Sequence, residues 1–349
     1  AIYNHCIALH KRYYRLHGKS LNMFRLQKHI TKLKKLEKYS FWNQVGSQAI
    51  QNITQRIDFG YKKFFKKDNK RPPTFRKSVR YKSFTLKQAG WALLGGNQIR
   101  IGKDIFKFSK SREIEGKIKT VTIKRDTLGN FFIFFACEIE VEPKNRTTIG
   151  KTTGIDFGLK TYLTFSDGTE EESPLFFKRG MKTIRKASQK LSSKKKGSNH
   201  RAKARLNLAR KHKKIANQRK DYPFQLANKL CQSYEYIFIE DLNLRGMVKL
   251  WGRKVNDLGF SDFIKILEHT ATKHRTTLHK IDRWFPSSKL CSGCGTINKA
   301  LSLRDRDWIC DCGSVHNRDH NAAINILREG SSSLGLGDVR QDESPAIAA

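Results

Sequence analysis

Three acidic residues lie in separate segments of the chain, each beside strongly apolar sequence. Asp156 is the third residue of Gly-Ile-Asp-Phe-Gly, Glu240 directly follows the apolar run 237–239, and Asp319 lies in His-Asn-Arg-Asp-His-Asn. Carboxylates in apolar surroundings are costly unless they are paired, and Mg²⁺ or Mn²⁺ is the natural partner for a group of them. Two such ions about 4 Å apart can clamp the attacking and leaving oxygens of a phosphodiester displacement. The three acids therefore form a candidate catalytic metal site.

Each acid also has an ordinary structural interpretation when it is taken alone. Asp156 could be a residue at a strand end, and Glu240 with Asp241 could cap the next helix. Asp319 could be the N-cap of a helix over 321–327. Only the combination of the three acids with the cysteine cluster favours a catalytic interpretation.

Four of the seven cysteines lie within 22 residues and form two close pairs. A glycine, Gly295 or Gly313, follows each pair and lets the backbone turn so that amides can face the sulfurs. Four thiolates at this spacing predict a closed structural zinc site. The second pair is one residue shorter than usual, so His316 remains an alternative to Cys312. The predicted ligands are Cys291, Cys294, Cys310 and Cys312.

The charge of the chain indicates the class of its partner. The 349 residues include 70 Lys and Arg against 31 Asp and Glu, which gives a formal net charge of +39. Such self-repulsion disfavours a compact chain unless a polyanion neutralises it, and nucleic acid is the obvious polyanion. A ribosomal-type protein or a membrane-surface binder would also be basic, so the charge leaves the activity open.

No segment reads as a membrane span or a secretory signal. The longest apolar run, 131–139, is the size of a strand, and the first twenty residues contain basic side chains throughout. Because the chain starts at Ala1, we expect an N-terminal piece to be missing. Clustered cysteines in an odd total favour an intracellular metal site over a disulfide framework. The other cysteines have apolar neighbours and are expected in cores: Cys6, Cys137 and Cys231.

The segment 1–67 has apolar stripes at helical spacing. Two stripes predict helices, and basic residues fill the remaining faces. The lobe could be a helical bundle with a solvated rim or a surface that contacts nucleic acid. The stripes are Leu26, Ile30, Leu33 and Leu36, then Ile50, Ile53, Ile57 and Phe64.

Short β-like runs follow the helix-breaking pair Pro72-Pro73. They cover 81–86, 98–101, 106–108, 117–123 and 131–140, with turn residues between them. Five such strands suggest a small β-barrel, a frequent platform for single strands and RNA. The segment 143–148 is predicted to be a linker.

The rest of the chain alternates strand-like and helical segments. Strands are expected at 153–159, 161–165, 236–239 and 277–281, with an amphipathic helix over 260–270. The stretch 178–220 holds eighteen Lys and Arg and no Asp or Glu, and 192–199 divides it into two helical halves. We interpret it as a helical hairpin that lies along a phosphate backbone.

Together these motifs resemble those of TnpB, a family encoded by many bacterial insertion sequences and related to type V CRISPR effector nucleases. The order and intervals of the motifs fit over about 150–328, and the N-terminal part agrees more loosely. The motifs are Gly154-Ile-Asp156-Phe-Gly158, Ile239-Glu240-Asp241-Leu242, Phe285-Pro-Ser-Ser-Lys289-x-Cys291-x-x-Cys294-Gly295 and Cys312-Gly-x-x-His316-x-Arg318-Asp319-x-Asn321-Ala322-Ala323-Ile324-Asn325.

The resemblance implies an α/β fold, in which an RNase H-like RuvC nuclease domain with an inserted zinc ribbon follows a small β-barrel with a helical insertion. The predicted parts are a helical nucleic-acid-binding lobe (1–67), an OB- or wedge-like β-barrel (68–148), a RuvC domain (149–290) with its basic hairpin (178–220), a zinc ribbon (291–315), a last RuvC segment (316–329) and a disordered tail (330–349).

By motif position, Asp156, Glu240 and Asp319 would be the catalytic acids that bind Mg²⁺ or Mn²⁺. Family members are RNA-guided DNA endonucleases, and their guide RNA comes from the end of their own element. Base pairing then reads the target, and the protein reads a short flanking motif. The implied partners are this guide RNA and double-stranded target DNA, in the bacterial cytoplasm at the nucleoid.

The chain departs from the family pattern at two places. The family usually has a further strand and helix start before a pair like Tyr3-Asn4, so the sequence does not decide whether the barrel closes. An acid is common where Asn317 stands, and we expect little catalytic effect from that change. The alternative functions are a strand-transfer transposase and a non-catalytic RNA- or DNA-binding regulator of transposition. The presence of all three acids argues against a decayed nuclease.

Overall fold

The computed structural model describes residues 1–140, 150–302 and 304–337. The chain divides into two compact units, Ala1–Glu142 and Pro143–Ala349. The helical lobe and the strand-rich segment expected as separate parts therefore belong to one unit. The predicted linker at 143–148 lies outside the described residues. Within the described part of the chain, no helix is long and apolar enough to cross a membrane.

Three α-helices of unit 1 pack around one apolar core. Leu26, Ile30 and Ile57 are almost completely buried there, as the helical stripes predict. Leu36 was expected to extend the first stripe but is 53% exposed, because α2 ends at Leu33. The helices are α1 (Ile2–His17), α2 (Met23–Leu33) and α3 (Ser47–Phe65), with the 3-10 helices η1 (Glu37–Gln44) and η2 (Ser78–Arg80).

The strands of unit 1 form two antiparallel sheets. Their orders are β1-β5-β6 and β2-β3-β4. The sequence missed β2, a short strand with glycines on both sides. Pairing among residues 1–140 does not join the two sheets, so the predicted small β-barrel is not confirmed. The strands are β1 (Ser83–Leu86), β2 (Trp91–Leu94), β3 (Gln98–Ile101), β4 (Asp104–Lys107), β5 (Lys117–Arg125) and β6 (Phe131–Glu138).

Unit 2 contains a five-stranded mixed sheet of order β11-β10-β7-β8-β9. The pairs β7–β8 and β8–β9 are antiparallel, whereas β10 runs parallel to both β7 and β11. The central strand β7 therefore joins the parallel and antiparallel parts of the sheet. The strands are β7 (Thr152–Phe157), β8 (Leu163–Phe165), β9 (Glu170–Glu171), β10 (Tyr236–Glu240) and β11 (Thr277–Ile281).

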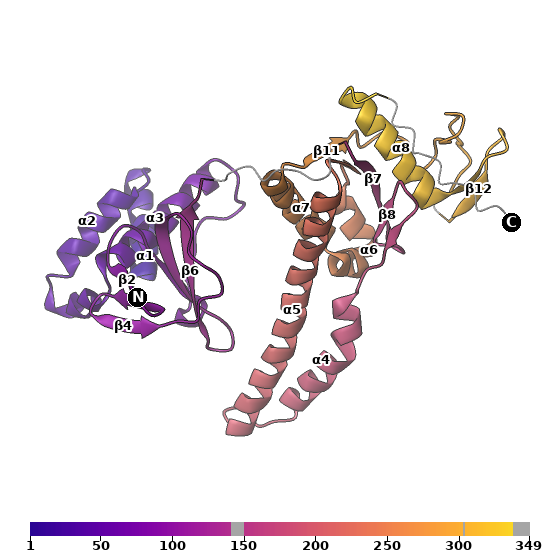
Figure 1. Cartoon of the computed structure of the whole chain (residues 1–349). Coiled ribbons are helices and arrows are strands. Elements are labelled where there is room, and N and C mark those ends of the chain that lie inside the picture. The colour runs from indigo at the N-terminus through magenta and orange to yellow at the C-terminus, as the bar shows by residue number, and fades with distance from the viewer. Residues whose placement is uncertain (141–149, 303, 338–349) are drawn as a thin grey trace. The chain divides into compact units, whose positions relative to one another are not determined.

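Helices cover both faces of this sheet, and α8 lies along β7 and β8 (Figure 1). Ile155, Ile237 and Ile239 share an apolar core with residues of α5, α6 and α7. On the other face, Phe238 packs with Ile326 of α8. The helices of unit 2 are α4 (Phe176–Ser192), α5 (Asn199–Ser233), α6 (Leu244–Leu258), α7 (Phe260–His274) and α8 (Arg318–Ser333).

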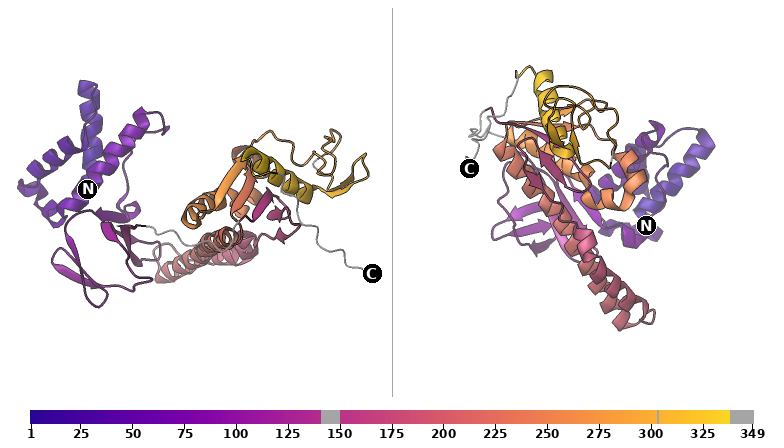
Figure 2. Two further views of the ribbon diagram at one scale, coloured as in Figure 1. Left: turned by 45° about the horizontal axis from the view of Figure 1, so that its top comes forward. Right: turned by 90° about the vertical axis from the view of Figure 1, so that its right-hand side faces the viewer.

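The two basic helical halves predicted over 178–220 are α4 and most of α5. These helices run side by side (Figure 1 and Figure 2). The two helices approach closely at Gly180, which has no side chain. A Cβ at this position would lie only 2.3 Å from Ile215 Cδ1. Ser198 caps α5 by accepting a hydrogen bond from the Arg201 amide. The Arg201 guanidinium donates to the carbonyl of Leu191 in the last turn of α4 and to that of Lys194 in the connecting loop, which fixes the tip of the hairpin.

A small antiparallel hairpin precedes α8 and consists of β12 (Asp307–Ile309) and β13 (Val315–Asn317). The helix α8 then continues to Ser333, so the prediction of a disordered tail from residue 330 is wrong for 330–333. Gly330 is buried because the Phe238 ring lies where a Cβ would otherwise stand, 2.0 Å away. The end of the predicted tail, 338–349, lies outside the described residues.

Candidate functional site

Strand alternation places two of the three acids on the face of the sheet that α8 covers. Successive side chains of a strand point to opposite faces. Ile155 and Ile239 are register partners on the parallel strands β7 and β10, and both point into the core opposite α8. Asp156 and Glu240 each follow one of these residues, so they lie next to each other on the α8 face.

A glycine contact brings the third acid to the same place. A Cβ at Gly154 would lie 2.2 Å from the Ala323 carbonyl oxygen and 2.6 Å from the Leu327 amide nitrogen. Only glycine therefore allows the backbone of α8 to contact β7 here. Asp319 lies one helical turn before Ala323, and Asp156 lies two residues after Gly154 on the same face. The glycine of the Gly-Ile-Asp motif thus sets how closely α8 packs against β7, and with it the position of Asp319 relative to Asp156.

The three carboxylates affect one another electrostatically. Burial, followed by the nearby charges of Glu240 and Asp319, raises the pKa of Asp156 to about 8. The Arg318 guanidinium and the backbone N–H of Phe157 oppose this shift. Burial also raises the pKa of Glu240. Neighbouring carboxylates that resist ionisation together form a site that a cation would stabilise.

Two of the acids have protein partners. The Ser287 hydroxyl donates a hydrogen bond to Glu240 Oε1. Arg306 Nη1 donates to both carboxylate oxygens of Asp319, at 2.8 and 2.9 Å. In the described part of the chain, the acids are less tightly gathered than the cysteine sulfurs, which all lie within 4.8 Å of one another. A bound cation would compete with the Arg306 contact for Asp319.

Asp319 is not the N-cap of its helix. Asn317 caps α8, because its side-chain oxygen accepts from the backbone N–H groups of Asp319 and His320. The structural alternative for Asp319 is therefore wrong, because its carboxylate pairs with Arg306 and does not cap the helix. Asn317, where the family commonly has an acid, has this capping role.

Two buried asparagines of α8 bind the loop that leads into the cysteine cluster. The Asn321 side chain accepts from the Ser292 amide and donates to the Leu290 carbonyl. Asn325 donates to the carbonyls of Ser287 and Leu290, at 2.8 and 2.7 Å. One side of α8 thus packs against β7 beside the acids, and another side holds the loop that begins the metal-binding knuckle.

The four predicted cysteines form one cluster. The sulfur atoms of Cys291 and Cys312 are 3.7 Å apart, and those of Cys294 and Cys310 are 3.6 Å apart. A tetrahedral zinc with bonds of about 2.3 Å would separate its sulfur ligands by about 3.8 Å. The donor set and its spacing therefore fit a zinc ion without rearrangement.

The backbone turns after each cysteine pair, and Cys312 is readily ionised. Gly295 and Gly313 both have positive φ, as expected for the turn after each pair. Hydrogen bonds from the side chain and backbone of Ser314 lower the pKa of Cys312 to about 6. His316 is not needed in place of Cys312: its Nε2 lies 3.0 Å from the Cys291 sulfur, where it can orient that ligand.

The other cysteines lie away from this cluster. Cys6 and Cys231 are buried, as predicted, and burial raises the pKa of the Cys6 thiol to about 12. Cys137 is only partly buried, because it lies in the outer strand β6 of its sheet.

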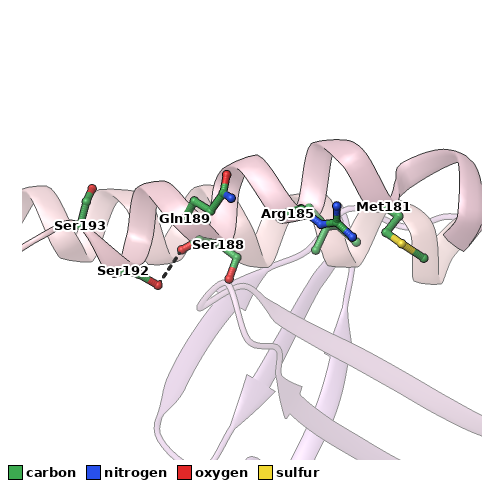
Figure 3. Close-up of a pocket in the computed structure, with 7 residues that line it drawn as sticks. Met181, Arg185, Ser188, Gln189, Ser192 and Ser193 are labelled. Carbon is green, nitrogen blue, oxygen red and sulfur yellow. Dashed lines mark hydrogen bonds between the residues drawn. The ribbon is translucent and has the colours of Figure 1, made fainter.

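An open site along α4 of the basic hairpin is lined by both apolar and polar side chains, with Met181 and Ile184 among the apolar ones. Figure 3 shows Met181 and Arg185 on one side of the helix, followed by a stretch of hydroxyl and amide side chains. Arginine, serine and glutamine are common ligands of phosphate and sugar oxygens, and no acid interrupts 178–220. The residues of this stretch are Ser188, Gln189, Ser192 and Ser193.

Sequence reasoning gave no role to several residues that shape the site. Ser287 lies inside a quoted motif, but only the fold shows that it contacts Glu240. Asn321 and Asn325 also lie in a motif, and their spacing of four residues indicates one helix face. Arg306 had no signal, because it is one of many basic residues in a loop.

Comparisons with known proteins agree with the motifs. The family model OrfB_IS605, described as "Probable transposase", matches residues 134–250. The model "Cas12f1-like, TNB domain" matches 260–326. A Streptomyces pristinaespiralis protein, named as a candidate RNA-guided DNA endonuclease, is 33% identical over 317 residues, covering 88% of this chain and 78% of that protein. The chain belongs to the TnpB family.

Further similarities span most of this TnpB-family chain. InsQ of Escherichia coli K12, also named as a candidate RNA-guided DNA endonuclease, is 27% identical over 317 residues, covering 86% of this chain and 78% of InsQ. A solved Cas12f1–sgRNA–target DNA complex shares the fold, with a TM-score of 0.56 and 14% identity over 93% of this chain and 80% of that one. The first family match includes Asp156 and Glu240, and the second includes the cysteines and Asp319.

Proposed function

We propose that this chain is an RNA-guided DNA endonuclease of a bacterial transposable element and that it hydrolyses phosphodiester bonds at a RuvC site. Its family membership supports the guided activity, since its relatives carry that name. The observation that carries the proposal for the site is the meeting of three acids from β7, β10 and α8 on one face of the sheet. Such a set, drawn from distant segments, has no evident structural purpose, because it costs stability in the absence of a cation.

Asp156, Glu240 and Asp319 would hold one or two Mg²⁺ or Mn²⁺ ions. When bound, such ions would activate a water molecule and neutralise charge on the phosphate. The attacking water forms a new bond to phosphorus while the bond to the 3′ oxygen breaks, and that oxygen leaves as a hydroxyl. Ser287 orients Glu240 through its hydrogen bond to Oε1. Arg306 must release Asp319 before that carboxylate can serve as a metal ligand.

The cysteine cluster would be a structural zinc site, since its four sulfurs leave no open coordination position. Its role follows from the contacts of α8: Asn321 holds the backbone at Ser292, next to the ligand Cys291. Folding of the ribbon would therefore fix the start of α8 and, with it, Asp319. Loss of the zinc should disturb the acid site even though the zinc takes no part in the chemistry.

The basic surfaces would bind the nucleic-acid partners. The hairpin of α4 and α5 and the helices of unit 1 supply phosphate contacts for a guide RNA from the element's own end and for its heteroduplex with target DNA. We also propose that the strands of unit 1 form the predicted OB- or wedge-like nucleic-acid-binding part of the protein. The protein would act in the bacterial cytoplasm, on DNA of the nucleoid.

Plasmid cleavage tests the proposal. The protein would be co-expressed with the flanking DNA of its element, purified with its RNA, and mixed with a plasmid that carries a matching sequence beside a randomised flank. We expect cutting that requires Mg²⁺ and the co-purified RNA. Asp156→Ala should abolish cutting and preserve RNA binding, whereas Asp104→Ala, which removes an exposed acid of β4, should cut normally.

The same assay separates the alternatives. A transposase would join element ends to a target without a guide, and such products would contradict the proposal. A regulator would bind RNA and leave the plasmid intact under all conditions.

A further inference from the structure

The loop after β11 displays a tryptophan to solvent. Trp284 is 85% exposed, more than any other large apolar side chain that the structure describes. Single exposed apolar residues are common on proteins, so exposure alone indicates little. The contacts of its neighbours make this position unusual.

Both sides of Trp284 are fixed. Arg283 on one side donates from Nε to the Asp241 carbonyl at 2.9 Å, and its guanidinium also pairs with the Asp241 carboxylate. Phe285 on the other side packs against the buried cluster that contains Phe238. The Trp284 amide itself donates to Asp282 Oδ1 at 2.6 Å. The backbone is therefore held while the indole points into solvent.

The residues that fix this loop are neighbours of the acid site. Asp241, which binds Arg283, directly follows Glu240 in the chain. Ser287, three residues after Trp284, donates to the Glu240 carboxylate. The loop is thus joined to residues 240 and 241 on both sides of the tryptophan. A rigid support of this kind is what a binding residue requires, because the ordering entropy is lost during folding rather than on binding.

The surroundings favour a nucleobase over a protein partner. Asp282 and Arg283, the two residues before Trp284, are exposed and charged, and an indole flanked by such residues fits a charged nucleic-acid strand better than an apolar protein surface. A strand whose phosphate lies at the acids must direct its bases away from them. An exposed indole can stack on any base, at about 1–3 kcal/mol per base.

We propose that Trp284 stacks on one base of the DNA strand being cut and so positions the neighbouring phosphate at the three acids. This inference rests on the proposed function, because it assumes that a strand reaches those acids. Stacking does not depend on base identity, so the contact would position a strand whose sequence the guide has already read. Trp284 is then a positioning residue for the reaction.

Tryptophan fluorescence tests the contact without requiring cleavage. The purified ribonucleoprotein would carry Asp156→Ala and would be titrated with a single-stranded oligodeoxynucleotide. Trp42 and Trp308 are buried and should respond little. We expect quenching that falls in Trp284→Leu to the part contributed by the other tryptophans, Trp91 and Trp251 among them, with binding weakened by about five- to 150-fold, the factor that corresponds to one stacked base. Trp284→Phe should retain most of the affinity, and Val79→Ala, at another exposed apolar residue, should retain all of it.

An abasic scan then locates the contact on the strand. In protein that retains Asp156, removal of one particular base near the cut should slow cleavage. In the Trp284→Leu variant, removal of the same base should have no effect on the cleavage rate. Equal quenching and equal binding in Trp284→Leu would overturn the inference, as would equal losses in the phenylalanine and leucine variants. A wild-type protein that shows quenching but never cuts would count against the nuclease proposal and leave the stacking contact supported.

Discussion

The contact between Gly154 and α8 should control both the stability of unit 2 and the placement of its third acid. Replacement of Gly154 by alanine would place a Cβ 2.2 Å from the Ala323 carbonyl oxygen, 2.6 Å from the Leu327 amide nitrogen and 2.9 Å from Leu327 Cβ. All three distances are shorter than van der Waals contact. Two of the three atoms belong to the helix backbone, so the clash cannot be relieved by a side-chain rotation. The helix must move away from the strand.

The expected loss of stability follows from overpacking. Added methyl groups in a tightly packed core typically cost about 1–3 kcal/mol. For a unit of this size, each kcal/mol lowers the melting temperature by about 2–4 °C. Because Asp319 lies one turn before Ala323, the displaced helix also carries that carboxylate away from Asp156. A misplacement of about 1 Å in a catalytic group can cost about 100-fold in rate.

Thermal unfolding followed by circular dichroism, together with plasmid cleavage, would measure both effects of Gly154→Ala. Gly252→Ala is the matched control, because that helical glycine has no atom within 4 Å of its added Cβ. The control should be neutral or slightly stabilising, by up to about 1 kcal/mol. If Gly154→Ala melts and cuts like the wild type, α8 does not depend on this glycine for its position, and the account of how the acids meet is wrong.

Three further predictions concern the ions and protons of the site. Arg306→Ala should free Asp319 and raise the apparent Mg²⁺ affinity by about two- to five-fold, as expected for a partly exposed ion pair; unchanged affinity by calorimetry would contradict the competition. Because burial raises the pKa of Asp156 to about 8, the folded protein without Mg²⁺ keeps this carboxyl protonated at pH values where the unfolded chain has ionised it. Its contribution to the free energy of unfolding is therefore largest at low pH. That contribution falls as the pH rises from the ordinary pKa of 3.8 to about 8, and above pH 8 it no longer changes. In melting experiments between pH 5 and 8, the wild type should therefore lose more stability than Asp156→Asn. Cys312→Ser should greatly reduce bound zinc, measured by elemental analysis, and Cys137→Ser should leave it unchanged; equal zinc in both proteins would exclude Cys312 as a ligand.

The two halves of the chain differ in how well the sequence predicted them. In unit 2 the predicted strand at 277–281 matches β11 in full, and the helical break at 192–199 separates α4 from α5. The break has a strong local signal, a charge run interrupted by Gly197, and β11 is a short run that begins with β-branched Thr277 and ends with β-branched Ile281. In unit 1, β2 was missed because glycines on both sides obscured it. Closure of the barrel could not be judged either, since it depends on pairing between distant strands.

The sequence by itself determined which side chains are candidates for the chemistry: three acids in apolar settings, four cysteines in two knuckles, and a long basic hairpin. These features depend on residue type and short spacings, which the covalent chain fixes directly. Tertiary structure alone decided that Ser287 and Arg306 bind two of the acids and that Trp284 faces solvent. These contacts join residues that are distant in the chain or depend on which face of an element is buried. Both depend on how the elements pack against one another in space, which no local residue pattern encodes.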